Sequence, residues 1–205
     1  MRQFLGKPKW IVLTVLVVVA TVAMVWAGFW QQRRLDERRD RNAEIRERAA
    51  AQVAPAGSVL TPDESVDEAR AAAEWRNVEA SGTYDAGAEV LIRNRSLDGA
   101  PGYHVVTPLV MADGTGVLVN RGWIPLSPEA GVAPEVPEPT PGEVTVVGRV
   151  RGSQERGALG PTDAADGTLE QLARVDVARI GQQVAYPLLP AYVELESQDL
   201  SLIHI

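Results

Sequence analysis

A continuous apolar segment, Trp10 to Trp30, constrains this chain more than any other feature of its sequence. Its 21 residues, WIVLTVLVVVATVAMVWAGFW, contain no charged side chain. As an α-helix at about 1.5 Å per residue, the segment would be about 31 Å long, which matches the hydrocarbon core of a bilayer at about 30 Å. Tryptophans lie at both ends, where aromatic side chains of a membrane helix meet the interface. We therefore expect residues 10–30 to span a membrane.

A cleaved secretory signal is the alternative explanation of this segment. A signal peptide has an apolar region of about 7 to 15 residues, followed by small residues at its cleavage site. Here the apolar run is longer, and it ends in residues 26–30 (WAGFW), where bulky aromatic side chains occupy positions that need small ones. The sequence therefore favours an uncleaved anchor.

Charge divides the remainder of the chain into two zones. Residues 31–54 form an arginine-rich extension with seven arginines, five acidic residues and several opposite charges at i,i+4 spacing, which is typical of a solvated helix. From Gln52 onward there are ten basic and 22 acidic residues. This acidity argues against nucleic acid as a partner, because phosphate backbones are also negative. We expect residues 55–199 to form the functional domain.

Basic residues on the two sides of the apolar segment bear on its orientation. Three precede it in residues 1–9, and five arginines follow it in residues 31–41. Because basic residues accumulate on the cytoplasmic side of membrane helices, this count by itself favours a cytoplasmic domain.

The acidic domain has the pattern of an α+β fold with mainly antiparallel strands and short helices. Thr61-Pro62-Asp63-Glu64 has the residues of a helix start and predicts a helix from there to about Trp75. A second short helix is predicted at 176–183. The proline-rich stretch 125–141 predicts an extended loop. Stretches rich in β-branched residues predict strands at 89–96, 103–112, 116–124, 144–150 and 191–196.

The dipeptide Asp113-Gly114 predicts a type I′ hairpin, because that turn prefers Asp-Gly at its two central positions. Both faces of this hairpin are apolar near the turn, so we expect a small barrel-like sheet or a sheet covered on both sides. The predicted cross-strand pairs are Ala112–Thr115, Val110–Val117, Pro108–Val119, Val106–Arg121, His104–Trp123, Leu109–Leu118 and Tyr103–Ile124.

The chain offers few groups for catalysis or metal binding. It has no cysteine, which excludes disulfides, thiolate metal sites and cysteine nucleophiles. A nucleophile elbow and a phosphate-binding glycine loop are also missing, which argues against a hydrolase or kinase. His104, the one histidine of the folded region, is either a single ligand to a metal or haem iron or a packing partner of Trp123. Arg93, Arg95 and Arg121 either hold an anionic group, such as a propionate or lipid phosphate, or form a solvated ladder.

Several stretches of the sequence resemble one known family. Residues 28–33 (GFWQQR), at the end of the apolar segment, resemble the first six positions of the G-x-W-Q-x-x-R signature of the Surfeit locus protein 1 family, the cytochrome c oxidase assembly factors. Residues 102–109 (GYHVVTPL) and 117–125 (VLVNRGWIP) resemble that family's second block. Gly82-x-Tyr84 and residues 192–195 (YVEL) keep the family's order, so the resemblance covers nearly the whole chain. Eighteen arginines against two lysines indicate a high-GC bacterium such as an actinobacterium.

The resemblance implies a non-catalytic membrane assembly factor for haem-copper cytochrome c oxidase, which aids delivery or insertion of haem a into subunit I. Its partners would be subunit I or assembly intermediates, together with membrane lipid. It also implies the cell membrane as location, with residues 1–9 cytoplasmic and the domain outside, because long segments translocate largely regardless of charge. The matching positions, which we expect to bind the partner, are Gly28, Trp30, Gln31, Arg33, Tyr103, Thr107, Pro108, Asn120, Arg121, Gly122 and Trp123.

The sequence departs from the family pattern at its C-terminal end. Family members carry a second membrane helix with a histidine near its start, whereas no long apolar stretch follows Leu188 here. Residues 200–205 (LSLIHI) are those that a transposon-end sequencing adapter encodes in frame, so we expect them to be an artefact on a truncated gene. On this expectation haem a is a ligand of the full-length protein, and His104 is the one haem-ligand candidate left in the folded region.

Two other classes of function stay open beside the assembly factor. One is a single-span scaffold of the cell envelope that binds another membrane protein through the acidic domain. The other is an envelope enzyme, which the missing catalytic motifs disfavour.

Overall fold

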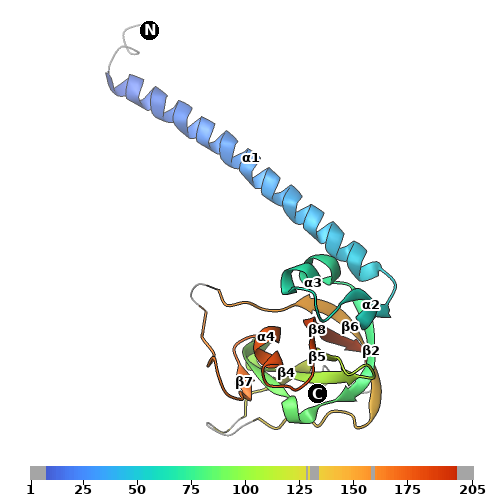
Figure 1. The fold of residues 1–205 in the computed structure, drawn as a ribbon. Coiled ribbons are helices and arrows are strands. Elements are labelled where there is room, and N and C mark those ends of the chain that lie inside the picture. The colour runs from blue at the N-terminus through green and yellow to red at the C-terminus, as the bar shows by residue number, and fades with distance from the viewer. Residues whose placement is uncertain (1–7, 128, 130–133, 158–159, 198–205) are drawn as a thin grey trace. The chain divides into compact units, whose positions relative to one another are not determined.

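The structure is a computed structural model that describes residues 8–127, 129, 134–157 and 160–197. The chain divides into two compact units, Met1–Glu47 and Arg48–Ile205. The first unit contains all but the last three residues of helix α1 (Pro8–Ala50), which continues without interruption from the apolar segment into the arginine-rich extension (Figure 1). Among the described residues it is the one helix long and apolar enough, by length and composition, to cross a membrane.

The second unit is built around a closed barrel of five strands, which confirms the predicted α+β fold with mainly antiparallel strands (Figure 1). The order is β2-β6-β8-β5-β4, and pairing between β2 and β4 closes the ring. Only β5 and β8 run parallel within the ring. The barrel strands are β2 (Asn77–Tyr84), β4 (Ala100–Met111), β5 (Gly116–Pro125), β6 (Glu143–Gly152) and β8 (Leu188–Ser197).

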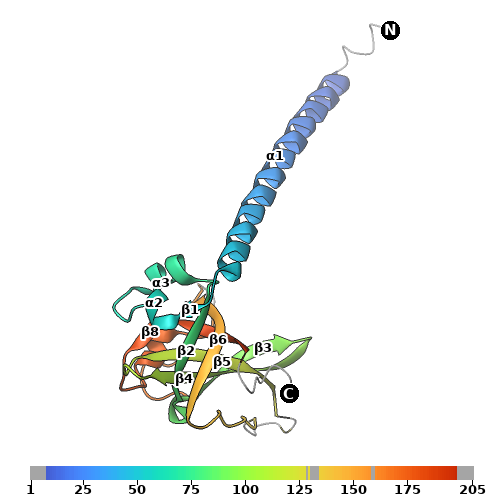
Figure 2. The same cartoon turned by 90° about the vertical axis from the view of Figure 1, so that its right-hand side faces the viewer.

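Three further strands lie outside the ring. β3 (Val90–Leu97) pairs with the first half of β4, and Figure 2 shows the end of this hairpin extending away from the barrel. The two-residue strands β1 (Ala54–Pro55) and β7 (Gln171–Leu172) pair in parallel with β2 and β3. Because β4 is long, one half of it pairs with β3 and the other half closes the barrel against β2.

The described residues of this unit also form four short helices: α2 (Ala56–Val59), α3 (Val66–Ala73), η1 (Ala86–Ala88) and α4 (Val177–Gly181). The predicted helix start at Thr61 is wrong. Ser65 caps α3 through a capping box with Glu68, whereas Thr61 and Glu64 form only a turn. Two successive segments carry the Ser/Thr-x-x-Glu pattern, and the one followed by the buried residues Ala69 and Ala73 is the helix.

Both faces of the β4–β5 hairpin are covered, as its apolar residues predicted. The barrel interior contains Leu109, Val117 and Val119 together with apolar residues of the other strands, and α2 and α3 pack against this cluster. On the outer face, Val106 and Leu118 pack with residues of β3, β8 and α4. The barrel therefore has an inner and an outer hydrophobic core.

Closure of the barrel depends on one glycine of β2. Gly82 pairs with Met111, and a Cβ at position 82 would overlap the backbone carbonyl of Val110 on β4. The β-branched pattern predicts no strand at 77–84, because the sequence there (NVEASGTY) has few such residues. Its side chains nevertheless alternate between buried and exposed, since one face of the strand lines the barrel interior.

The predicted type I′ turn at Asp113-Gly114 is wrong. The loop has three residues, 112–114: Met111 N donates to Thr115 O at 2.9 Å, Gly114 N donates to Met111 O at 3.0 Å, and Gly114 has φ +82°. This is a three-residue hairpin loop with its glycine in the left-handed region. The type I′ pattern, with positive φ at two successive residues, occurs instead at Asp98-Gly99 between β3 and β4.

The extra loop residue shifts the register of the hairpin by one position near the turn. Val110 pairs with Gly116 and Val106 with Asn120, so the predicted partners of residues 106–112 are wrong. A β-bulge at Arg121 then restores the register. The predicted pairs His104–Trp123 and Tyr103–Ile124 are therefore confirmed. The extra residue in the loop shifts the register by one position, and the extra residue in β5 at the bulge shifts it back.

Candidate functional site

The motif residues of the β4–β5 hairpin form two separate polar networks, one around Arg121 and one around His104. The bulge explains the separation. Arg121 is the residue that β5 has in excess over β4, so it has no partner opposite, and it does not lie beside Val106 as predicted. Thr107 belongs to the network of Arg121, while Asn120 belongs to that of His104.

The first network is a set of four residues that we call the Arg121 clamp: Glu89, Thr107, Arg121 and Pro137. Glu89 Oε2 accepts from Arg121 Nη1 at 2.6 Å and from Thr107 Oγ1 at 2.7 Å. Arg121 Nη2 donates to the Pro137 carbonyl at 2.8 Å. The side chains of Arg121 and Glu89 are only 5% and 17% exposed, so this is a buried ion pair with hydrogen bonds to two further groups.

Tyr84 completes the surroundings of the clamp. The Arg121 guanidinium carbon lies 5.7 Å from the centroid of the Tyr84 ring, within the range of a cation–π contact. Burial raises the pKa of Tyr84 to about 12, against the opposing effect of the Arg121 charge, so the ring stays neutral. The sequence marks Tyr84 only as a motif residue, and Glu89 matches no motif. The one signal for Glu89 is indirect, because a buried arginine needs a carboxylate partner.

The second network fixes the protonation of His104. Asn120 Oδ1 accepts from the backbone N–H of Gly122 at 3.2 Å, which turns the amide nitrogen of Asn120 toward His104 Nδ1 at 3.2 Å. Nδ1 therefore accepts a hydrogen bond, and the ring proton sits on Nε2. Burial and the positive charge of Arg95 lower the pKa of His104 to about 4, so the ring is neutral.

This tautomer bears on the two alternatives for His104. A metal-bound histidine usually donates through its second ring nitrogen to a carbonyl or carboxylate, which leaves the first nitrogen unprotonated for the metal. In His104, Nδ1 accepts a hydrogen bond from Asn120 instead, and Nε2 carries the proton. The arrangement favours a packing and hydrogen-bonding role. Among the described residues, no three His, Asp or Glu side chains are grouped as metal ligands.

Trp123 links three strands. Its Nε1–H donates to the Arg95 carbonyl of β3 at 3.3 Å, across the intervening strand β4. The ring can cross β4 because Gly102 has no side chain there, and a Cβ at that position would overlap both the indole and the Ile124 carbonyl. Gly102 and Trp123 are thus a matched pair within the motif.

The remaining motif residues of the hairpin support this geometry. Gly122 has φ +139° directly after the bulge. Pro108 pairs with Leu118 on β5, and Tyr103 packs against the small apolar cluster of Leu91, Val105 and Ile124.

The three arginines Arg93, Arg95 and Arg121, for which the sequence left an anion site or a solvated ladder open, have separate partners. Arg93 pairs with Asp163 at 2.5 Å, Arg95 donates to Gln154 Oε1 at 2.7 Å, and Arg121 pairs with Glu89. A left-handed residue, Asn94, lies between the first two arginines and interrupts the register of β3. The structure does not bring the three guanidinium groups together on one ligand.

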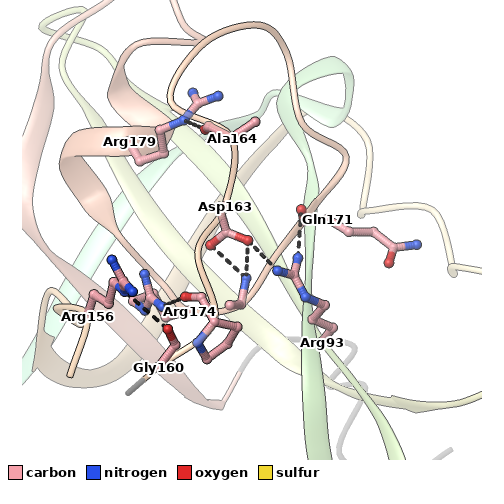
Figure 3. Close-up of polar contacts among 10 residues, drawn as sticks. Arg93, Arg156, Gly160, Asp163, Ala164, Gln171, Arg174 and Arg179 are labelled. Carbon is pink, nitrogen blue, oxygen red and sulfur yellow. Dashed lines mark hydrogen bonds and ion pairs between the residues drawn. The ribbon is translucent and has the colours of Figure 1, made fainter. Parts of the chain in front are cut away.

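Figure 3 shows what Arg93 does instead. The Asp163 carboxylate lies between Arg93 and the backbone N–H of Ala173, from which it accepts at 3.0 and 3.1 Å. Arg156 and Arg179 donate to the carbonyls of Gly160 and Ala164. These bonds attach the described part of the long loop before β7 to β3 and α4, so this arginine cluster has a structural role.

The first motif lies on α1, in the other unit. Gly28 and Trp30 end the apolar segment and Gln31 and Arg33 follow it, so the last three of these residues lie within about one helical turn. The guanidinium carbon of Arg34 lies 5.4 Å from the centroid of the Trp30 ring. An indole held by an arginine in this way suits the membrane interface.

The partly buried His104 predicts a pH dependence of stability. The folded-state pKa of His104 is about 4 and its ordinary value is 6.5, so the unfolded chain binds the proton first as the pH falls. The contribution of His104 to stability is complete above pH 6.5 and is lost as the pH falls to 4, a change of about 1–3 kcal/mol because solvent screens the partly exposed ring. Urea unfolding of the wild type and of His104→Gln at several pH values measures this. The variant should show a shallower decrease, whereas identical slopes would contradict the assignment.

Comparison with known proteins finds one family model that matches this chain and several similar proteins. The model of the SURF1 family matches residues 18–202. An uncharacterized SURF1-like protein of Mycobacterium tuberculosis (strain ATCC 25618 / H37Rv) is 27% identical over 194 residues, 94% of this chain and 69% of the relative. The cytochrome oxidase assembly protein SHY1 of Saccharomyces cerevisiae is 28% identical over 155 residues, 74% of this chain and 38% of the yeast protein.

A shorter match has higher identity. A SURF1-like protein of Dictyostelium discoideum is 42% identical over 57 residues, 28% of this chain and 21% of that protein. The family resemblance noted in the sequence is confirmed, because the family model extends from within the apolar segment through the last strand of the barrel. The chain belongs to the SURF1 family.

Proposed function

We propose that this chain is a non-catalytic membrane assembly factor for haem-copper cytochrome c oxidase. The observation that carries the proposal is the similarity, over 74% of the chain, to a yeast protein named as a cytochrome oxidase assembly protein, within a family match that covers most of the chain. The site is consistent with a binding role, because its motif residues are engaged in hydrogen bonds that shape a surface rather than in a catalytic constellation.

Within oxidase assembly, we place the role at the delivery or insertion of haem a into subunit I, as the family resemblance suggests. The test is deletion of the gene, followed by measurement of haem a absorbance and of subunit I by immunoblot in the same membranes. We expect subunit I to persist while haem a absorbance falls several-fold, and the plasmid-borne gene to restore it. Normal haem a oxidase in the deletion strain would refute an assembly role.

The alternative is a single-span envelope scaffold that binds another membrane protein through its acidic domain. Co-purification with the tagged full chain separates the two functions. Recovery of oxidase subunits supports the assembly factor, whereas recovery of division or secretion proteins without oxidase subunits supports the scaffold.

We further propose that Met1 is cytoplasmic and that the barrel lies on the outer side of the cell membrane. The length of the domain supports this orientation, because long segments translocate largely regardless of flanking charge. Alkaline phosphatase fused after Glu196 should therefore be active in whole cells. A fusion that is stably expressed but inactive would place the barrel in the cytoplasm.

The motif on α1 predicts that this helix does more than anchor the chain. Trp30, Gln31 and Arg33 cluster within about one turn at the end of the apolar segment, where they can meet the membrane part of a partner. Replacing residues 1–34 by an unrelated membrane helix of equal length should abolish oxidase assembly, while the barrel still reaches the membrane. The matched control exchanges residues 10–27 only and keeps the motif. Full assembly by both chimaeras would show simple anchoring.

A further inference from the structure

The proline-rich segment 134–141 (PEVPEPTP) lies along the barrel with a three-residue repeat. Glu135, Glu138 and Pro141 are exposed, whereas the five other residues of the segment are partly buried. A repeat of three is that of a polyproline II helix, which has three residues per turn and no internal hydrogen bonds. Such a segment is held in place only by what it contacts.

Two of the contacts that attach the segment to the barrel lie at adjacent residues. Val136 packs against the apolar cluster of Leu91, Val105 and Ile124. The carbonyl of Pro137 accepts from Arg121 Nη2 at 2.8 Å. One anchor is therefore apolar and the other polar, and they are chemically independent of each other.

The geometry of the clamp suits it for this attachment. A buried ion pair is weak evidence for stability, since apolar residues of similar size often stabilise a core as well. Here, however, Glu89 Oε2 binds Nη1 and leaves Nη2 of the planar guanidinium directed at a carbonyl of another segment. Thr107 donates to the same carboxylate oxygen and helps to fix it. The ion pair thus holds the guanidinium group, with its two donor nitrogens, in one orientation. The single ammonium group of a lysine could not donate to both partners in this way.

We infer that Glu89, Thr107 and Arg121 are positioning residues that hold residues 134–141 as a fixed rib on the barrel, and that they affect oxidase assembly through this rib. Thr107 and Arg121, which match the family block, then do not themselves contact the partner. Glu89, which lies outside every motif, belongs with them. The inference rests on the proposed function for its effect on the oxidase, but not for the attachment of the rib.

The first test is Arg121→Lys in the full chain. Lysine keeps a positive charge beside Glu89 but lacks the second arm that reaches Pro137. We expect the barrel to stay folded, cleavage of the folded chain after Glu135 by a glutamate-specific protease to become about tenfold faster or more, and assembled oxidase to fall several-fold. Arg149→Lys is the matched control. Arg149 pairs with Glu196 near the surface, so both readouts should stay at wild-type values.

The second test releases the rib without touching the clamp. Val136→Ser removes the apolar anchor and should give the same increase in the rate of cleavage after Glu135 and the same loss of oxidase. If the two anchors act on one element, the double variant should lose little more oxidase than either single variant. If Arg121→Lys fails to fold, Val136→Ser still tests whether the rib affects oxidase assembly, because this variant keeps the ion pair of Arg121 and Glu89.

Three results would overturn the inference. An unchanged rate of cleavage in both variants would show that these contacts do not hold the rib. Faster cleavage with normal oxidase would show that the rib has no role in assembly. Loss of oxidase in Arg121→Lys without faster cleavage would place Arg121 in direct contact with the partner. A deletion strain with normal oxidase would instead refute the proposed function, and the cleavage rates would still report on the clamp.

Discussion

Arg121→Ala is expected to destabilise the barrel by about 3–5 kcal/mol and to lower assembled haem a oxidase far more than Arg151→Ala does. The substitution leaves the Glu89 carboxylate, which is 17% exposed, without its cationic partner and leaves the Pro137 carbonyl without its donor. An unpaired buried charge costs several kcal/mol, so the effect should exceed that of losing any exposed ion pair of this chain.

Arg151 is the matched comparison because it is also an arginine on a barrel strand with a carboxylate partner. It lies 3.3 Å from Glu194, its side chain is 28% exposed, and its guanidinium carbon is 3.9 Å from the centroid of the Trp75 ring. Removing a partly exposed pair and one cation–π contact should cost about 1 kcal/mol. Urea unfolding of the purified chains gives the stabilities, and reduced-minus-oxidised spectra of membranes give the oxidase. Equal effects of the two substitutions would remove Arg121 from the site.

Gly82→Ala is expected to prevent closure of the barrel, with a loss of about 3 kcal/mol or cooperative unfolding altogether. The added methyl group would overlap the backbone carbonyl of Val110, and backbone on a paired strand cannot move aside as a flexible side chain can. Strands β2 and β4 would separate, which would open the ring and expose the apolar cluster of the barrel interior to water.

Gly57→Ala is the control for this substitution. A Cβ at Gly57 meets no atom within 4 Å, and alanine is favoured over glycine in a helix. Its stability should therefore equal or slightly exceed that of the wild type. Thermal unfolding followed by near-UV circular dichroism, which reports tertiary packing, distinguishes the two variants. A cooperative transition of Gly82→Ala at the wild-type temperature would show that the barrel tolerates the extra atom.

Local chemistry by itself determines several features of this protein. An uncharged run of 21 residues near the start of the chain predicts the long apolar helix, because length and composition decide whether a helix can lie in hydrocarbon. Strong β-branched stretches predict β3, β4, β5, β6 and β8, and two apolar faces on one hairpin predict a covered or closed sheet. The motifs at residues 28–33 and 102–125 indicate the family that the comparison confirms.

Register is the feature that the sequence alone does not determine. Two Asp-Gly dipeptides lie in this hairpin region, at 98–99 and 113–114, and both fit a type I′ turn on sequence grounds. Only Asp98-Gly99 adopts the type I′ turn. The loop at 113–114 has three residues instead of two, and the register shift that results is reversed by the bulge at Arg121. A single extra residue reverses which face every later side chain occupies, and no local pattern marks where it lies.

The site itself is decided by tertiary contacts. Motif matching identifies Arg121, Thr107 and Asn120. The predicted hairpin register, however, assigns Arg121 to the face of His104, whereas the bulge directs it to Glu89. Glu89 and the Pro137 carbonyl lie 32 and 16 residues away from Arg121 along the chain and carry no motif. Barrel closure brings these distant partners to Arg121, and the free-energy cost of leaving a buried charge unpaired keeps them there. Neither effect operates until the strands have assembled.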